Sequence, residues 1–123
     1  MKDTKLYSLI SWAVGLILAL FFMLNGLPKI TPTRSEEVAN QFESWGYSAE
    51  FAVAIGILEI LGGVMVLIPR VAFYGALILI VIMVGAVYTH ISTGIGSPVF
   101  AIFLLILAIA QSILTKRKAL LLA

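Results

Sequence analysis

A few polar side chains stand alone inside long apolar stretches of this sequence. Glu59 lies in the run IGILEILGG and has no basic residue within ten positions on either side. A carboxylate that leaves water needs a proton, a counterion or strong hydrogen bonds. Inside a membrane such a group is a candidate for a ligand site or a proton relay. We therefore take these six residues as pocket candidates: Glu59, His90, Asn25, Lys29, Trp45 and Gln111.

Each polar candidate also has a purely structural interpretation. Glu59 can be protonated and bonded to a carbonyl of a neighbouring helix, and Gln111 can hold two helices together. Lys29 can extend its ammonium group to the headgroups as a membrane anchor. His90, near the end of an apolar run, can be an interfacial histidine without any chemistry. The residues alone leave these alternatives open.

Several classes of chemistry have no residues to support them. The chain has no cysteine and one histidine, so thiolate chemistry is excluded and we expect no metal site. No nucleophile and base pair or phosphate-binding loop is recognisable, so no catalytic residue is assigned. Whether the chain is an enzyme is left open.

The elements that position these residues are apolar and long. Hydrophobic residues make up 62% of the 123 residues and charged residues only 11%. A soluble domain has about 25% charged residues, so much of this chain must face lipid. Runs of about 20 apolar residues can cross the hydrocarbon core as helices. The sequence predicts an all-α, integral membrane four-helix bundle, one domain over 1–123, with spans at about 6–27, 48–68, 71–92 and 98–115.

The basic residues predict the orientation of these four spans. With four crossings, six of them fall on one side: Lys2, Lys5, Arg70, Lys116, Arg117 and Lys118. Lys29 and Arg34 fall on the other side. Because cytoplasmic loops of membrane proteins carry an excess of Lys and Arg, both termini are predicted to be cytoplasmic. The predicted location is the cell (inner) membrane. The basic residues are scattered, so no nucleic-acid partner is expected.

The loop over 28–47 is predicted to carry a short amphipathic helix. Val38, Phe42 and Trp45 share one face of such a helix. One interpretation is a helix lying on the membrane surface with Trp45 at headgroup level. The other is a lid over the outer mouth of the bundle.

Helical spacing places the intramembrane polar residues on stripes of small residues. Glu59 shares its face with Gly56 and Gly63, and His90 shares its face with Ala86. Turning such stripes inward avoids the cost of exposing polar groups to lipid. Glu59 lies near the middle of its span, whereas Lys29 lies at the outer end of another. We expect no direct ion pair between these two, unless the first span is shifted or broken near NGLPK.

Four motifs resemble those of the DoxX family, in order and over nearly the whole chain: NGLPKI at 25–30, WGYSAEF at 45–51, IGILEILGGVMVLIPR at 55–70 and MVGAVYTHI at 83–91. The resemblance implies a four-helix membrane protein linked to thiosulfate oxidation, quinone reduction and membrane redox complexes. It also marks eight residues as family positions: Gly26, Lys29, Trp45, Gly46, Gly56, Glu59, Ala86 and His90. Gly26, Gly56, Gly63 and Ala86 are assigned to helix packing.

The resemblance and the residues leave three functions to compare. The first is a subunit or accessory of a quinone-linked redox complex, with a quinone or another lipid-soluble molecule as ligand. The second is a non-enzymatic assembly protein, chaperone or binder of lipid-like molecules. The third is a small transporter, which we rank last because the sequence shows no inverted repeat. The expected partners are membrane lipid and either a membrane-associated protein or a second copy of the chain.

Overall fold

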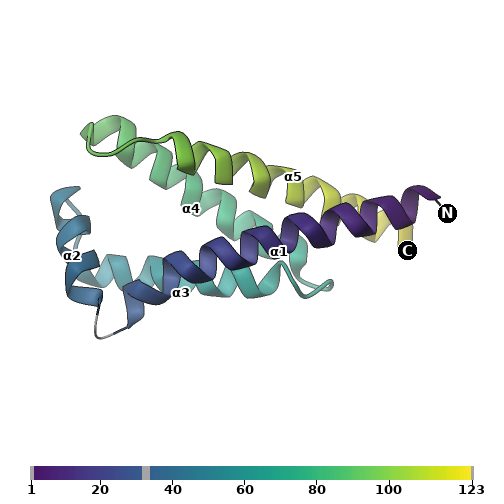
Figure 1. Ribbon diagram of the computed structural model, residues 1–123, viewed down its shortest axis with the longest axis horizontal. Coiled ribbons are helices and arrows are strands. Elements are labelled where there is room, and N and C mark those ends of the chain that lie inside the picture. Colours follow the sequence, from purple (N-terminus) through teal and green to yellow (C-terminus); the bar gives the residue numbers. More distant parts are fainter. Residues whose placement is uncertain (1, 32–33, 123) are drawn as a thin grey trace.

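The computed structural model describes residues 2–31 and 34–122 and is all-helical (Figure 1). Within those residues there are five helices and no strand. The helices are α1 (Lys2–Ile30), α2 (Ser35–Ser44), α3 (Ala49–Met65), α4 (Ala72–Thr93) and α5 (Val99–Leu122). The all-α prediction is therefore confirmed, and a short helix lies in the segment between the first two apolar runs.

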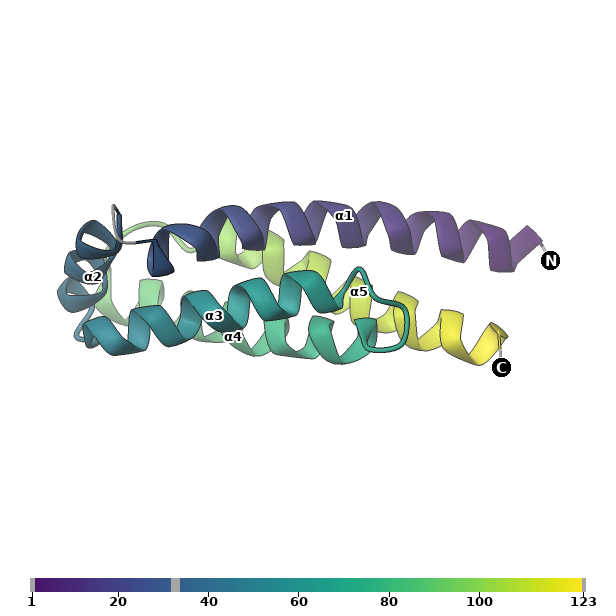
Figure 2. The same ribbon diagram turned by 90° about the horizontal axis from the view of Figure 1, so that it is seen from below.

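The four longer helices run side by side, and α2 lies across one end of them (Figures 1 and 2). α1 packs against α3 and α5, and α4 packs against the same two helices. Both described chain ends and the α3–α4 turn lie at the end opposite α2 (Figure 2). We call the α2 end the outer end and the opposite end the inner end.

Three of the helices, α1, α4 and α5, are long and apolar enough to cross a membrane. α3 is shorter, with 17 residues, which corresponds to about 25 Å of helix. It reaches the length of a longer span only together with α2, from which it is bent by 112°. Three to four crossings are therefore supported, and the described chain is a multi-pass membrane protein.

Helix α1 continues through Pro28 to Ile30, whereas the predicted span ends at residue 27. Pro28 lies inside the last turn, and Thr31 N–H donates to the Leu27 carbonyl at 3.0 Å to close that turn. Proline has no N–H to donate to the Leu24 carbonyl and its ring crowds that carbonyl, yet the helix continues to Ile30. The consequence is that Lys29 belongs to α1 and not to the loop.

The core lies between the four long helices, and small residues allow the backbones to approach. Leu18, Phe22 and Leu79 are the largest apolar side chains that are fully buried. A Cβ placed on Gly63 would lie 3.6 Å from the Ala19 carbonyl, so α3 packs on α1 with almost no side chain between them. This close packing is what membrane helices use in place of hydrophobic burial.

The α2–α3 connection folds back tightly over the outer end. α2 is amphipathic and buries Phe42, while Gly46 adopts a φ of 91° that most residues avoid. The Ser48 hydroxyl then caps α3 by accepting from Phe51 N–H at 3.2 Å. This turn sets Trp45 and Tyr47 beside the outer ends of the long helices.

Candidate functional site

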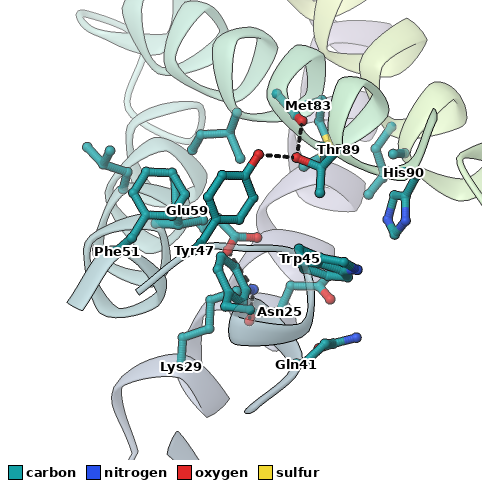
Figure 3. Close-up of a pocket in the computed structure, with 18 of the residues that line it drawn as sticks. Asn25, Lys29, Gln41, Trp45, Tyr47, Phe51, Glu59, Met83, Thr89 and His90 are labelled. Carbon is teal, nitrogen blue, oxygen red and sulfur yellow. Dashed lines mark hydrogen bonds and ion pairs between the residues drawn. The ribbon is translucent and has the colours of Figure 1, made fainter. Parts of the chain in front are cut away.

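A pocket of about 560 Å³ lies in the outer half of the molecule (Figure 3). Each of the five helices contributes residues to its wall. Most of the wall is apolar or aromatic, and its polar side chains come from α1, α2, α3, α4 and the turns beside them. Five of the six predicted candidates line it: Asn25, Lys29, Trp45, Glu59 and His90.

The centre of the polar wall is an ion pair between Lys29 and Glu59. Lys29 Nζ lies 2.7 Å from Glu59 Oε1, and the two side chains are 14% and 4% exposed. The expectation that these two residues form no direct pair is therefore wrong. A shift of the first span, which the sequence analysis named as an exception, explains the pair. α1 is unbroken, but it is shifted inward relative to α3.

The shift follows from the contact between two glycines. A Cβ on Gly56 would lie 2.6 Å from Lys29 Cβ, and a Cβ on Gly26 would lie 2.8 Å from the Gly56 carbonyl. Lys29 is therefore level with Gly56, which is about 10 Å below the start of α3 at Ala49. One turn further along α3 brings Glu59 within reach of the lysine.

Lys29 is held by more than its counterion. Its Nζ also donates to the Asn25 carbonyl at 2.8 Å, and it lies 6.0 Å from the centre of the Phe42 ring in α2. The side chain thus points back along α1, the direction in which helical side chains lean. The ammonium group of Lys29 thus contacts α1, α3 and α2.

Glu59 is buried but incompletely satisfied. Among the described residues its Oε1 accepts no well-directed hydrogen bond, so the contact with Lys29 is an ion pair by distance. Buried carboxylates usually accept several hydrogen bonds. The carboxylate therefore has room to accept a further bond from a group that enters the pocket.

Trp45 and His90 form the outer rim of the pocket. Their rings meet edge to face with centroids 5.3 Å apart (Figure 3). Trp45 Nε1–H is buried and has no hydrogen-bond partner among the described residues. An indole N–H can only donate, so the rim offers a free donor.

The hydrogen bonding of His90 fixes which ring nitrogen carries the proton. Nδ1 lies 2.8 Å from the Ile95 carbonyl, and because a carbonyl can only accept, Nδ1 donates. Nε2 of the neutral ring is then an acceptor. Gly96, with a φ of 76°, passes close over the ring, since a Cβ there would lie 3.1 Å from Nδ1.

Tyr47 and Thr89 were not among the sequence candidates, and they close the pocket at its outer edge. Their hydroxyl oxygens are 2.7 Å apart (Figure 3). Thr89 gives its only proton to the Gly85 carbonyl at 2.8 Å, so Tyr47 must be the donor to Thr89. The position of Tyr47 in the WGY motif, two residues after Trp45, was the available signal.

The remaining predicted residues take different places. Gln111 does not line this pocket, because it lies 1% exposed in the inner half and donates to the Ser11 carbonyl at 3.0 Å. Its geometry matches the inter-helix alternative. Asn25 lines the pocket but donates to the Phe21 carbonyl of its own helix at 2.8 Å. Ala86 lines the pocket wall, whereas Gly26, Gly56 and Gly63 lie at helix contacts. No group of three His, Asp or Glu side chains converges in the described ranges.

Together the fold and the pocket define an all-helical multi-pass membrane protein with a polar site among its helices. The DoxX-like family model matches residues 13–112, and the chain belongs to this family. The chain is also 30% identical over 115 residues to the uncharacterized protein YwoB of Bacillus subtilis strain 168, covering 84% of this chain and 75% of that protein. No solved structure matches.

Proposed function

We propose that this protein is a four-helix bundle that binds a lipid-soluble molecule with a polar, ring-shaped head, and that the molecule is a quinone. In this proposal the protein serves as a subunit or accessory of a membrane redox complex. The pocket beside the Lys29–Glu59 pair carries the proposal. It combines a large apolar wall with charged and hydrogen-bonding groups at one place.

The residues of the pocket fit a quinone head. Quinone oxygens accept hydrogen bonds, and Trp45 Nε1–H is a buried donor without a partner among the described residues. The aromatic rings of Phe42, Tyr47 and Phe51 line the same pocket and suit a flat ring. A bound quinone would supply electron and proton transfer, while Lys29 and Trp45 would orient it and Glu59 would hold a proton.

The proposed orientation places both termini in the cytoplasm. The sequence analysis counted Lys29 and Arg34 as the two cations on the outer side. Lys29 is paired with Glu59 inside the protein, so Arg34 is left as the outer cation of that count. Arg70 lies in the α3–α4 turn at the same end as the described termini (Figure 2). This distribution agrees with the preference of Lys and Arg for the cytoplasmic side.

Fluorescence quenching tests the proposed binding. Trp12 and Trp45 are the two tryptophans of the chain, so Trp12→Phe leaves Trp45 as the sole indole reporter. We expect a decyl-substituted benzoquinone to quench Trp45 emission saturably in detergent. Lys29→Met in the same background should weaken this binding about tenfold or more, equivalent to about 1.4 kcal/mol. Mass spectrometry of an organic extract of the purified protein identifies the native ligand.

Lys5→Met is the matched control for Lys29→Met. Lys5 lies exposed at the inner end of α1 and does not line the pocket. Its replacement should leave quenching unchanged. Absence of saturable quenching together with absence of quinone in the extract contradicts the quinone proposal. A lipid of another class in the extract would favour the lipid-binding alternative.

A further inference from the structure

Helices α3 and α4 are in tight contact in the inner half of the molecule. A Cβ on Gly62 would lie 2.7 Å from Leu79 Cδ2, and a Cβ on Gly75 would lie 2.7 Å from Met65 Cβ. No hydrocarbon chain can pass between backbones this close. The α3–α4 interface is therefore sealed toward the inner end.

The same two helices separate toward the outer end. Helical spacing continues the Gly62 stripe of α3 through Leu58 to Phe51. On α4, Ile78 also lies against Gly62, and the same face continues seven residues on to Gly85. Gly85 is exposed, and a Cβ on it would meet nothing within 4 Å. Figure 1 shows α4 and α5 diverging from α1 and α3 toward the outer end.

The gap between α3 and α4 ends at a hydrogen bond near the outer end, and the opposite side of the pocket is closed by an aromatic contact. The Tyr47–Thr89 hydrogen bond bridges α4 and the start of α3 at the outer edge. Thr89 is ten residues from Leu79, so the gap extends over about 15 Å of α4. On the other side of the pocket, Phe21 of α1 and Phe100 of α5 meet edge to face at 5.5 Å.

Residues at this gap face the membrane and the pocket at once. Phe51, Leu58 and Val81 are 42%, 39% and 72% exposed, yet all three line the pocket. Gly85 does the same. We call these four residues the α3–α4 window. The pocket thus opens sideways between α3 and α4 as well as at the outer end.

We infer that the ligand enters sideways from the bilayer and keeps a hydrocarbon tail in the α3–α4 window. The window is lined by apolar groups and lies at the depth of the apolar helices, so acyl or isoprenoid chains are the molecules that surround it. The inference rests on the proposed function for the polar head at Lys29–Glu59. It adds the ligand class, a molecule with a single long apolar tail.

Single-cysteine labelling tests the window without requiring the native ligand. The chain has no cysteine, so Ala86→Cys places a unique thiol on the pocket wall. N-dodecylmaleimide, dissolved in the membrane, is the probe, and labelling is normalised to that in denaturant. Ala76→Cys is the matched control, because Ala76 lies in the same helix, is 0% exposed and does not line the pocket. We expect Ala86→Cys to react and Ala76→Cys to resist.

Narrowing the window distinguishes this route from entry at the outer mouth. Val81→Phe or Gly85→Leu should slow labelling of Ala86→Cys by roughly tenfold, because a close-packed side chain blocks the gap. Val84→Phe changes a lipid-facing valine that does not line the pocket, and it should have no effect. Unchanged labelling in both window variants overturns the inference, as does equal labelling of Ala76→Cys. Intact window-dependent labelling without quinone binding would sink the quinone proposal and leave the window standing.

Discussion

At the scale of single residues, the pair of Lys29 and Glu59 decides how the interior is organised. A lone charge at the centre of a membrane helix costs roughly 3 kcal/mol on insertion scales. Two opposite charges 2.7 Å apart largely avoid this cost, because each is the counterion of the other. Removing one partner leaves the second charge buried, which is worse than having neither.

A double-mutant cycle tests this interdependence. Glu59→Ala should lower the free energy of unfolding by about 3 kcal/mol, because Lys29 then lacks its counterion. Adding Lys29→Met should recover most of the loss, since no unpaired charge remains. Thermal unfolding in detergent provides the measurement. Additive losses in the double variant would show that the pair is not coupled.

The types of residues at the site follow from the sequence, but their pairing does not. Polar groups in or at the ends of apolar runs identified Asn25, Lys29, Glu59 and His90, and the amphipathic loop pattern identified Trp45. The ion pair was missed because the depth of each residue was counted from the centre of its own span. Only the Gly26–Gly56 contact shows that α1 is shifted inward. Such an offset depends on how two surfaces fit, which a single sequence does not specify.

At the scale of helices, two glycines of similar appearance have opposite roles. Gly56 lies against Lys29 and Gly26, whereas Gly85 has open space beside it. The first keeps α1 and α3 in contact, and the second leaves α4 apart from α3. Replacing each glycine by alanine therefore distinguishes two effects on stability. At Gly56 the new methyl group disturbs packing, and at Gly85 it changes only the helix propensity.

Gly56→Ala should destabilise the fold by about 1–3 kcal/mol, because the new methyl group forces α1 and α3 apart. Gly85→Ala should be neutral or stabilising by up to about 1 kcal/mol, since alanine favours helix and meets no neighbour. Melting temperatures of the two variants in the same detergent provide the comparison. Equal destabilisation would contradict the close contact of α1 and α3.

The Tyr47–Thr89 hydrogen bond ties the turn after α2 to α4. Tyr47→Phe removes the donor to Thr89, a contribution of about 1 kcal/mol. We expect faster amide hydrogen exchange over residues 42–47 with little change in α4. Tyr88→Phe is a suitable control, because Tyr88 is exposed on α4 and does not line the pocket. Unaltered exchange at 42–47 would mean that the aromatic contacts of Phe42 suffice.

At the scale of the whole molecule, the two ends differ in what they expose. The inner end carries Arg70 and the described chain ends, and the outer end carries α2 and the α4–α5 turn (Figure 2). In the proposed orientation, a membrane-impermeant maleimide should label Ser97→Cys in intact cells. It should label Arg70→Cys only after lysis. The reverse pattern would place the termini outside.

The sequence specifies the helical content well and the crossing number less well. α4 lies within one residue of its predicted span at each end, and a short helix lies in the loop where the amphipathic pattern predicted one. α1 (Lys2–Ile30) and α5 (Val99–Leu122) extend beyond the apolar runs at 6–27 and 98–115. α3 ends at Met65, three residues before the predicted end at Ile68, because the chain turns at 66–71 toward α4. The window could not be predicted, since it reflects the angle between helices and not the composition of either one.

The inner half of the molecule is closed, and this limits what the protein can do with a ligand. Gln111 donates to the Ser11 carbonyl at 3.0 Å, and Gly15 lies against the same amide group. Together with the Gly62 and Gly75 contacts, this closes the described inner half between α1 and α5 and between α3 and α4. In the proposed function, a ligand therefore enters and leaves through the outer mouth or the α3–α4 window. In the proposed orientation, a ligand that reaches this pocket comes from the outer leaflet of the membrane.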